Sequence, residues 1–247
     1  MIEVYFSVIL LSLLSIITTL IGVGLALLFK ENRKGIAVGI GFSAGIMLLI
    51  SLLELIPESI NSSGITMTII SLLLGMLLIG ILNFIIPHTH FVKEEGKIKS
   101  SLLKSAYLIA IGLILHDFPE GFAMANSYIY SPALGLLIAL AIAIHNIPEE
   151  FAMAVPLISV KKKGSLLKAG FFSALAEPLG AVIGLIAVGF IPGLNPLFMS
   201  FAAGAMIFVS IHELLPMARK YKNDLLFIIG FMISIAVYYA LSVIIPK

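Results

Sequence analysis

The sequence contains no cysteine, and charged side chains are scarce. Without cysteine, disulfide bonds and thiolate metal ligands are excluded, so any metal must be bound by His, Asp, Glu, Asn or Met. Charged residues make up 11% of the 247 residues, against about 25% in soluble domains. Hydrophobic residues make up 60%, and the mean hydropathy is +1.16. These values exclude an ordinary soluble domain and a disordered chain, and they predict a polytopic membrane protein.

Eight long apolar runs account for most of the chain. Each is more than twice the roughly 10 residues that a barrel strand needs, and none alternates strictly, so the runs predict helices. A helical span takes about 20 residues, and eight spans leave no room for a soluble domain. We therefore expect one all-α transmembrane domain over residues 1–247. The predicted spans are about 5–29, 36–56, 65–87, 101–124, 132–158, 165–190, 195–215 and 225–245, with a loop at 88–100.

Basic residues are absent from every second connection. Fourteen of the fifteen Lys and Arg residues lie in or beside the connections after the first, third, fifth and seventh runs, and the exception is Lys247. The connections around 57–64, 125–131 and 190–196 contain none. By the positive-inside rule, the basic connections, including the loop at 88–100, face the cytoplasm. The pattern predicts an integral protein of the plasma or cell inner membrane with both termini extracytoplasmic.

Two segments of the sequence are repeated. Residues 116–125 read HDFPEGFAMA, and residues 145–154 read HNIPEEFAMA. A longer similarity aligns residues 42–59, FSAGIMLLISLLELIPES, with residues 201–218, FAAGAMIFVSIHELLPMA. The charge rule gives the two members of this longer pair opposite orientations across the membrane. The longer similarity therefore predicts an inverted repeat, which is typical of secondary transporters.

Five carboxylates lie well inside the apolar runs, with no Lys or Arg at the same depth. They are Asp117, Glu120, Glu149, Glu150 and Glu177. Each costs roughly 2.5–3.5 kcal/mol near a helix centre on insertion scales. Such groups must be protonated, exposed to a water-filled cavity, or neutralised by bound cations. A water-filled cavity or bound cations at these carboxylates would indicate a cation pathway through the protein.

The repeated motif arranges its polar residues on one side of each helix. At about 100° per residue, the glutamate of each motif projects between the histidine and the residue that follows the histidine. If the two helices face each other, the glutamates can bridge two cations, one flanked by the histidines and the other by Asp117 and Asn146. Mixed imidazole and carboxylate donors favour Zn, Fe, Mn, Co or Ni over Ca or Mg. The predicted ligands are His116, Asp117, Glu120, His145, Asn146 and Glu149.

Prolines interrupt the backbone hydrogen bonding beside these residues. Pro119, Pro148 and Pro178 each lack a backbone N–H, so each releases the carbonyl four residues earlier and kinks its helix. In a membrane, such loosening is tolerated where the backbone packs against protein or lines a cavity. We expect kinked helices with free carbonyl oxygens beside the site.

Other polar residues leave a functional and a structural interpretation open. A first group of polar residues can form a gate or a secondary metal site. Alternatively, charged side chains near span ends reach the membrane surface and are tolerated there without a function. The members of this group are Glu54, Glu150, Ser210, His212 and Glu213. His88 and His90, in the loop at 88–100, can capture metal or form an ordinary solvated histidine pair.

The motifs HDFPEG and HNIPEE resemble the signature of the ZIP (Zrt/Irt-like) family of divalent metal transporters, and the resemblance covers essentially the whole chain. It implies eight helices in a 3+2+3 arrangement with inverted repeats, metal transport by an elevator-like movement, and a homodimer. It also implies a binuclear site that adds Glu177 to the six ligands above. Asp117 and Glu150 depart from the family's usual asparagine and glycine. Both changes add negative charge, so the metal selectivity of relatives does not transfer.

We therefore predict a transporter that moves zinc, or alternatively iron, manganese, cobalt, nickel or cadmium, into the cytoplasm. The expected partners are divalent metal ions, the lipid bilayer and a second copy of the chain, with no nucleic acid and no catalytic cofactor. One alternative is a passive metal channel built from the same ligands. The other is an intramembrane metalloprotease, because His212 and Glu213 begin an HExxH-like string, but position 216 is proline instead of the second histidine.

Overall fold

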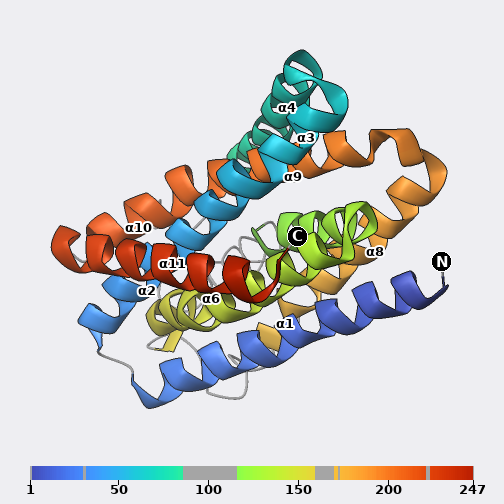
Figure 1. The fold of residues 1–247 in the computed structure, drawn as a ribbon. Helices are drawn as coiled ribbons and strands as arrows, with labels where there is room; N and C mark the ends of the chain where they lie inside the picture. Colours follow the sequence, from blue (N-terminus) through green and yellow to red (C-terminus); the bar gives the residue numbers. More distant parts are fainter. Residues whose placement is uncertain are drawn as a thin grey trace.

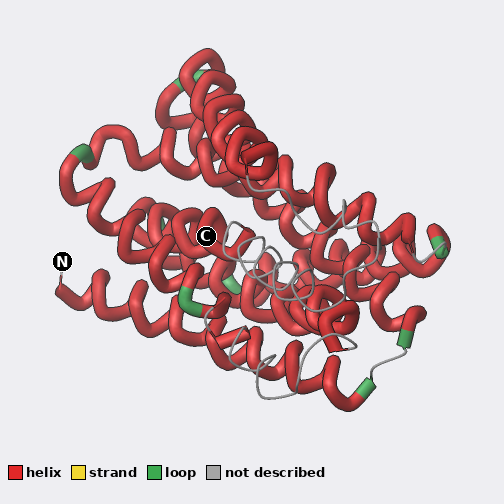
Figure 2. The backbone as a smooth tube through the Cα atoms, turned by 180° about the vertical axis from the view of Figure 1, so that it is seen from behind, coloured by secondary structure: helices red, strands yellow, loops and turns green. Residues whose placement is uncertain are grey.

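The computed structural model describes residues 2–29, 32–85, 116–158, 170–171, 173–220 and 223–246. In this part of the chain every regular element is a helix (Figures 1 and 2). The named elements are α1 (Ile2–Leu28), α2 (Arg33–Ile50), η1 (Ser51–Leu55), α3 (Ile56–Ser63), α4 (Ile65–Ile85), α6 (Pro132–Ile158), α8 (Ala176–Phe190), η3 (Pro192–Leu194), α9 (Asn195–Val209), η4 (Ser210–Leu214), α10 (Leu215–Lys220) and α11 (Asp224–Ile244). A further helix covers residues 116–130.

Six helical segments in the described residues are long and apolar enough to cross a membrane. They are Ile2–Leu28, Arg33–Ser63, Ile65–Ile85, Pro132–Val155, Pro192–Arg219 and Asp224–Ile244. The predicted spans 101–124 and 165–190 lie partly outside the described residues, and the helix at 116–130 and α8 are their described portions. The loop at 88–100 lies wholly outside. The all-helical prediction is confirmed for the described chain, whereas the count of eight spans stays a prediction.

Two helices continue into the predicted connections around 57–64 and 125–131. The helix that contains α2 continues through η1 and α3 to Ser63, and the helix at 116–130 extends past 124. An apolar run marks the part of a helix that lies in hydrocarbon, whereas backbone hydrogen bonding continues into polar residues beyond it. Gly64 ends α3 with φ 79° and ψ 160°, a conformation that is essentially restricted to glycine.

Helix α1 has one face of mostly small residues and one face of large apolar residues. Its buried positions recur every three or four residues and include Val8, Ser12, Ser15, Thr19, Gly22 and Ala26. This face packs against α6 and α8. The opposite face exposes Phe6, Leu10, Leu13, Ile17 and Ile21. Small residues permit close approach between membrane helices, and the exposed large side chains are suited to lipid contact.

The longer sequence similarity has a counterpart in local structure. A π-helical turn occurs at Ser51–Leu55 and again at Ser210–Leu214, 159 positions later. Each turn ends two residues before a proline, at Pro57 or Pro216. A proline cannot donate the usual backbone hydrogen bond, and the preceding N–H in each copy bonds to the carbonyl five residues back. The repeat therefore preserves a specific backbone distortion as well as a hydrophobic pattern.

The two copies also pack in corresponding ways. Helix α2 packs on α11, and α9 packs on α4. A Cβ atom at Gly75 would lie 1.9 Å from the Phe201 carbonyl oxygen, and one at Gly204 would lie 2.0 Å from that of Leu72, so α4 and α9 approach too closely for side chains there. The end of each copy lies against the start of the other, because α10 contacts α2 and α3 contacts α9. The copies therefore run in opposite directions (Figure 1).

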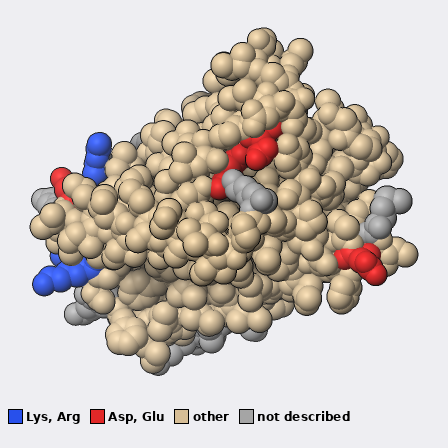
Figure 3. Space-filling view, in the orientation of Figure 1, with Lys and Arg blue, Asp and Glu red and all other residues tan. Residues whose placement is uncertain are grey.

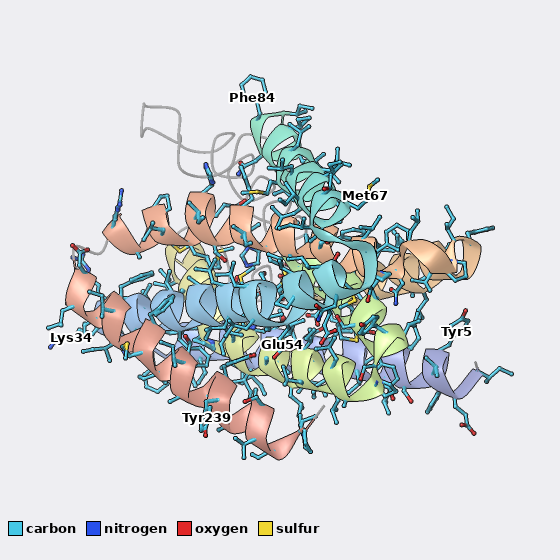
Figure 4. All side chains as sticks on the ribbon, turned by 45° about the horizontal axis from the view of Figure 1, so that its top comes forward. Tyr5, Lys34, Glu54, Met67, Phe84 and Tyr239 are labelled. Atoms are coloured by element: carbon cyan, nitrogen blue, oxygen red, sulfur yellow. The ribbon has the colours of Figure 1, made fainter. Side chains whose placement is uncertain are left out.

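The described helices pack mainly in two groups. One contains α1, α6, α8 and the helix at 116–130, and the other contains α2, α4, α9 and α11. Between the groups, α2 packs on α6, and there the Ser43 hydroxyl donates to the His145 carbonyl at 3.0 Å. The described Lys and Arg side chains gather at one end of the molecule (Figure 3). Lys34 marks this end, and Tyr5 lies at the other (Figure 4).

Candidate metal-binding site

Two histidines and two glutamates from the repeated motifs meet in the interior. One ligand atom each from His116, Glu120 and Glu149 lies within 4.8 Å of the others. His116 Nε2 contacts Glu149 Oε1. His145 Nε2 lies 3.1 Å from Glu120 Oε1 and 3.4 Å from Glu149 Oε2. All four side chains are at most 3% exposed. We call these four residues the His–Glu cluster.

Helical spacing and backbone contacts orient the His–Glu cluster. In each motif the histidine and the glutamate are four residues apart, so they lie on the same face of their helix. His145 Nδ1 lies 2.9 Å from the Ala141 carbonyl oxygen one turn earlier. This hydrogen bond makes Nδ1 the protonated nitrogen and leaves Nε2, which faces the carboxylates, with a lone pair for a metal ion.

A second set of site residues offers only oxygen donors to a cation. Asp117 Oδ2 accepts a hydrogen bond from the Ser173 hydroxyl at 3.1 Å. Asn146 Nδ2 donates to Glu177 Oε2 at 3.0 Å. Glu177 lies in the first turn of α8, where the helix dipole favours a negative charge. We call Asp117, Asn146 and Glu177 the oxygen-lined side.

The structure thus buries all seven predicted primary ligands. Four form the His–Glu cluster, and the other three belong to the oxygen-lined side. The described basic side chains lie near helix ends, at Arg33, Lys34 and Arg219. A cluster of carboxylates and imidazoles without a basic partner favours cations, and the mixed donors suit a transition metal such as zinc. That these residues bind metal remains a prediction.

The residues predicted for a gate or secondary site do not join the His–Glu cluster. Glu54 lies in the interior (Figure 4), where it accepts a hydrogen bond from the Tyr238 hydroxyl. Glu213 accepts one from Asn83 at 3.2 Å. His212 is exposed and stacks on Phe208 with ring centroids 4.2 Å apart. The last two predicted residues of this kind, Ser210 and Glu150, are buried, and His88 and His90 lie outside the described residues.

The Glu54–Tyr238 hydrogen bond yields a stability prediction. Glu54 is 1% exposed, so Tyr238→Phe removes a donor from a buried carboxylate and should lower stability by about 1–3 kcal/mol. Thermal unfolding in detergent measures the change. Tyr239→Phe is a matched control, because Tyr239 is 68% exposed. Equal melting temperatures for the two variants would contradict the prediction.

Several side chains that support the site were not predicted from the sequence. Ser43 and Ser173 donate to site residues, and Tyr238 and Asn83 donate to the two glutamates of the π-helical turns. Each lies far from its partner along the chain. Their only sequence signal is a polar group within an apolar run, and that signal does not identify the partner.

Comparisons with known proteins agree with the motifs. The sequence model of the family described as ZIP Zinc transporter matches residues 87–242. The zinc transporter ZupT of Streptococcus mutans is 36% identical over an alignment that covers 91% of this chain and 92% of that protein. ZupT of Oceanobacillus iheyensis is 36% identical over 87% of this chain and 88% of its own. ZupT of Chlorobium chlorochromatii is 35% identical, with 94% of each chain covered.

The family match at residues 87–242 includes both copies of the shorter repeat, at 116–125 and 145–154. The helical membrane architecture and the two buried motifs fit the same assignment. The chain therefore belongs to the ZIP zinc transporter family.

Proposed function

We propose that this protein carries Zn²⁺ across the membrane into the cytoplasm and binds it between the helix at 116–130 and α6. The observation that carries the proposal is the His–Glu cluster, which is buried among helices of an integral membrane protein and has imidazole and carboxylate donors. These donors are common zinc ligands. The relatives, which are named zinc transporters, support the same cargo.

The proposed site holds two cations. The His–Glu cluster binds the first, and the oxygen-lined side binds the second, with Glu120 and Glu149 bridging the two positions. The reciprocal contacts of these glutamates with the two histidines support the first position. The pairing of Asn146 with Glu177 beside the cluster supports the second. Iron, manganese, cobalt, nickel and cadmium are further candidate cargoes, because they accept similar donors.

The proposed movement is an elevator-like sliding of one helix group against the other, in a 3+2+3 arrangement of eight spans. The two packing groups and the opposite directions of the repeated segments favour this movement over a static pore. We place the end that carries Arg33 and Lys34 in the cytoplasm by the positive-inside rule, which leaves both termini outside. The metal ions and the lipid bilayer are the proposed partners, with a second copy of the chain in a homodimer.

The enzyme alternative is discarded. Members of this family are transporters, so the protein is not a metalloprotease. His212 stacks on Phe208, and Pro216 occupies the place of the second histidine of an HExxH motif. The passive channel differs from the carrier in kinetics, because a channel conducts rapidly with weak saturation.

Metal influx into proteoliposomes tests the proposal. The unmodified protein is compared with Glu120→Ala over a panel of zinc, iron, manganese, cobalt, nickel and cadmium, and Glu3→Gln at an exposed position is the control for loss of one carboxylate. We expect saturable zinc influx that Glu120→Ala abolishes and Glu3→Gln retains. No influx, or equal influx in all three proteins, would contradict the proposed site, and non-saturating flux would favour the channel.

A further inference from the structure

Glu150 is a buried carboxylate that directly follows a residue of the His–Glu cluster. It is 2% exposed, and its Oε2 atom has no hydrogen-bond partner among the described residues. Helix α1 covers it, because a Cβ atom at Gly22 would lie 2.7 Å from the Glu150 Cβ. Glu150 is therefore enclosed by protein and does not project into lipid. A buried carboxylate oxygen without a partner is rare and calls for a ligand.

Each motif packs closely against a neighbouring helix through a glycine, but the glycine lies on a different helix in the two cases. In the first motif the equivalent position is Gly121, where a Cβ atom would lie 1.9 Å from the Glu177 carbonyl oxygen of α8. In the second motif α1 supplies the glycine instead, at Gly22, and the motif position carries a glutamate. The glycine of α1 thus leaves space for the Glu150 side chain in the second motif, whereas the contact with α8 leaves no such space at position 121 of the first motif.

The extra carboxylate of Glu150 lies next to the oxygen-lined side along α6. Glu150 lies one helical turn after Asn146 on the same face of α6. Its carboxylate is near enough to Asp117, Glu149, Glu120 and Glu177 for like-charge repulsion with all four. The oxygen-lined side offers two carboxylates and an amide, with the Ser173 hydroxyl beside them, whereas both imidazoles belong to the His–Glu cluster. A divalent cation relieves the repulsion, and oxygen-only donors suit Mn²⁺ better than Zn²⁺.

We propose that Glu150 is a specificity-determining residue that gives the oxygen-lined side its preference for Mn²⁺. Glu150 adds a third negative charge to Asp117 and Glu177, and it compensates for the neutral Asn146. The His–Glu cluster keeps its preference for Zn²⁺, because Glu150 adds no nitrogen donor to it. The inference rests on the proposed function, since it concerns the second cation position of the same site.

Mn²⁺ binding to the purified full chain in detergent tests this inference without transport. Electron paramagnetic resonance of free Mn²⁺ gives its Kd, and competition with a chromophoric chelator gives the Kd of Zn²⁺. Glu150→Gln keeps the shape of the side chain and removes its charge. We expect the Mn²⁺ Kd to rise at least about tenfold, as for loss of a residue that supports a metal, while the Zn²⁺ Kd changes by less than about threefold.

Two further variants complete the design. Glu150→Asp keeps the negative charge and should weaken Mn²⁺ binding less than Glu150→Gln does, and Glu3→Gln should change neither Kd. An unchanged Mn²⁺ Kd in Glu150→Gln, or an equal weakening of both metals, would overturn the inference. A wild-type protein that fails to import zinc would instead contradict the proposed function, whereas zinc import together with an unchanged Mn²⁺ Kd would overturn only the role of Glu150.

Discussion

Glu149→Ala is expected to lower zinc influx at least about 100-fold. Loss of a residue that merely orients a ligand costs about 10–100-fold in metal affinity, so loss of a direct ligand should cost at least as much. Glu149 contacts both His116 and His145, and it belongs to the His–Glu cluster. The substitution therefore removes a proposed bridge between the two cation positions and a contact that holds both imidazoles.

Two measurements separate this effect from misfolding. Zinc influx into proteoliposomes reports transport, and the melting temperature in detergent with and without zinc reports binding. A ligand that binds only the folded state raises the melting temperature by mass action, so zinc should stabilise the wild type and not Glu149→Ala. Influx within about threefold of wild type would contradict the assignment of Glu149 as a ligand.

Gly121→Ala is expected to destabilise the protein by about 3 kcal/mol or more. The new Cβ would lie 1.9 Å from the Glu177 carbonyl oxygen and 3.0 Å from the Ala181 backbone nitrogen. Both neighbours are backbone atoms of α8, so the clash is relieved only if the two helices separate. Overpacking of a close contact costs about 1–3 kcal/mol, and a clash with backbone lies at or beyond the top of that range. The separation would also draw Glu177 away from Asn146.

Gly24→Ala is the matched control. It makes the same chemical change in a helix, but among the described residues its new Cβ would meet no heavy atom of a neighbouring helix within 4 Å. The variant should therefore be neutral or more stable by up to about 1 kcal/mol. Thermal unfolding followed by circular dichroism compares the two variants, and zinc binding is measured on the same samples. A Gly121→Ala melting temperature as high as that of Gly24→Ala would contradict the close packing of these helices.

The sequence predicts which motif residues lie together better than it predicts the helix ends. Spacing within each motif places histidine and glutamate on one face, and the absence of basic partners implies a cation, so His116, Glu120, His145 and Glu149 follow from local geometry. The repeat at 42–59 and 201–218 likewise anticipates equivalent helices. In both cases the pattern that supports the prediction is contained within a single segment of a few helical turns.

The remaining features depend on contacts between distant segments. The partners of Asp117 and Glu54 are Ser173 and Tyr238, which only tertiary packing brings near them. The enclosure of Glu150 depends on Gly22 of α1, more than a hundred residues earlier. Helix ends such as Ser63 are missed because hydropathy reports the lipid-facing length of a helix and not its hydrogen bonding.

Anomalous diffraction at the zinc edge, from crystals of the zinc-loaded protein, tests the proposed metal site most directly. We expect a zinc peak between the helix at 116–130 and α6, within about 2.0–2.2 Å of imidazole nitrogens and carboxylate oxygens. In crystals of Glu149→Ala this peak should be absent. Zinc bound stoichiometrically elsewhere in the protein, with no peak at the His–Glu cluster, would contradict the proposed site.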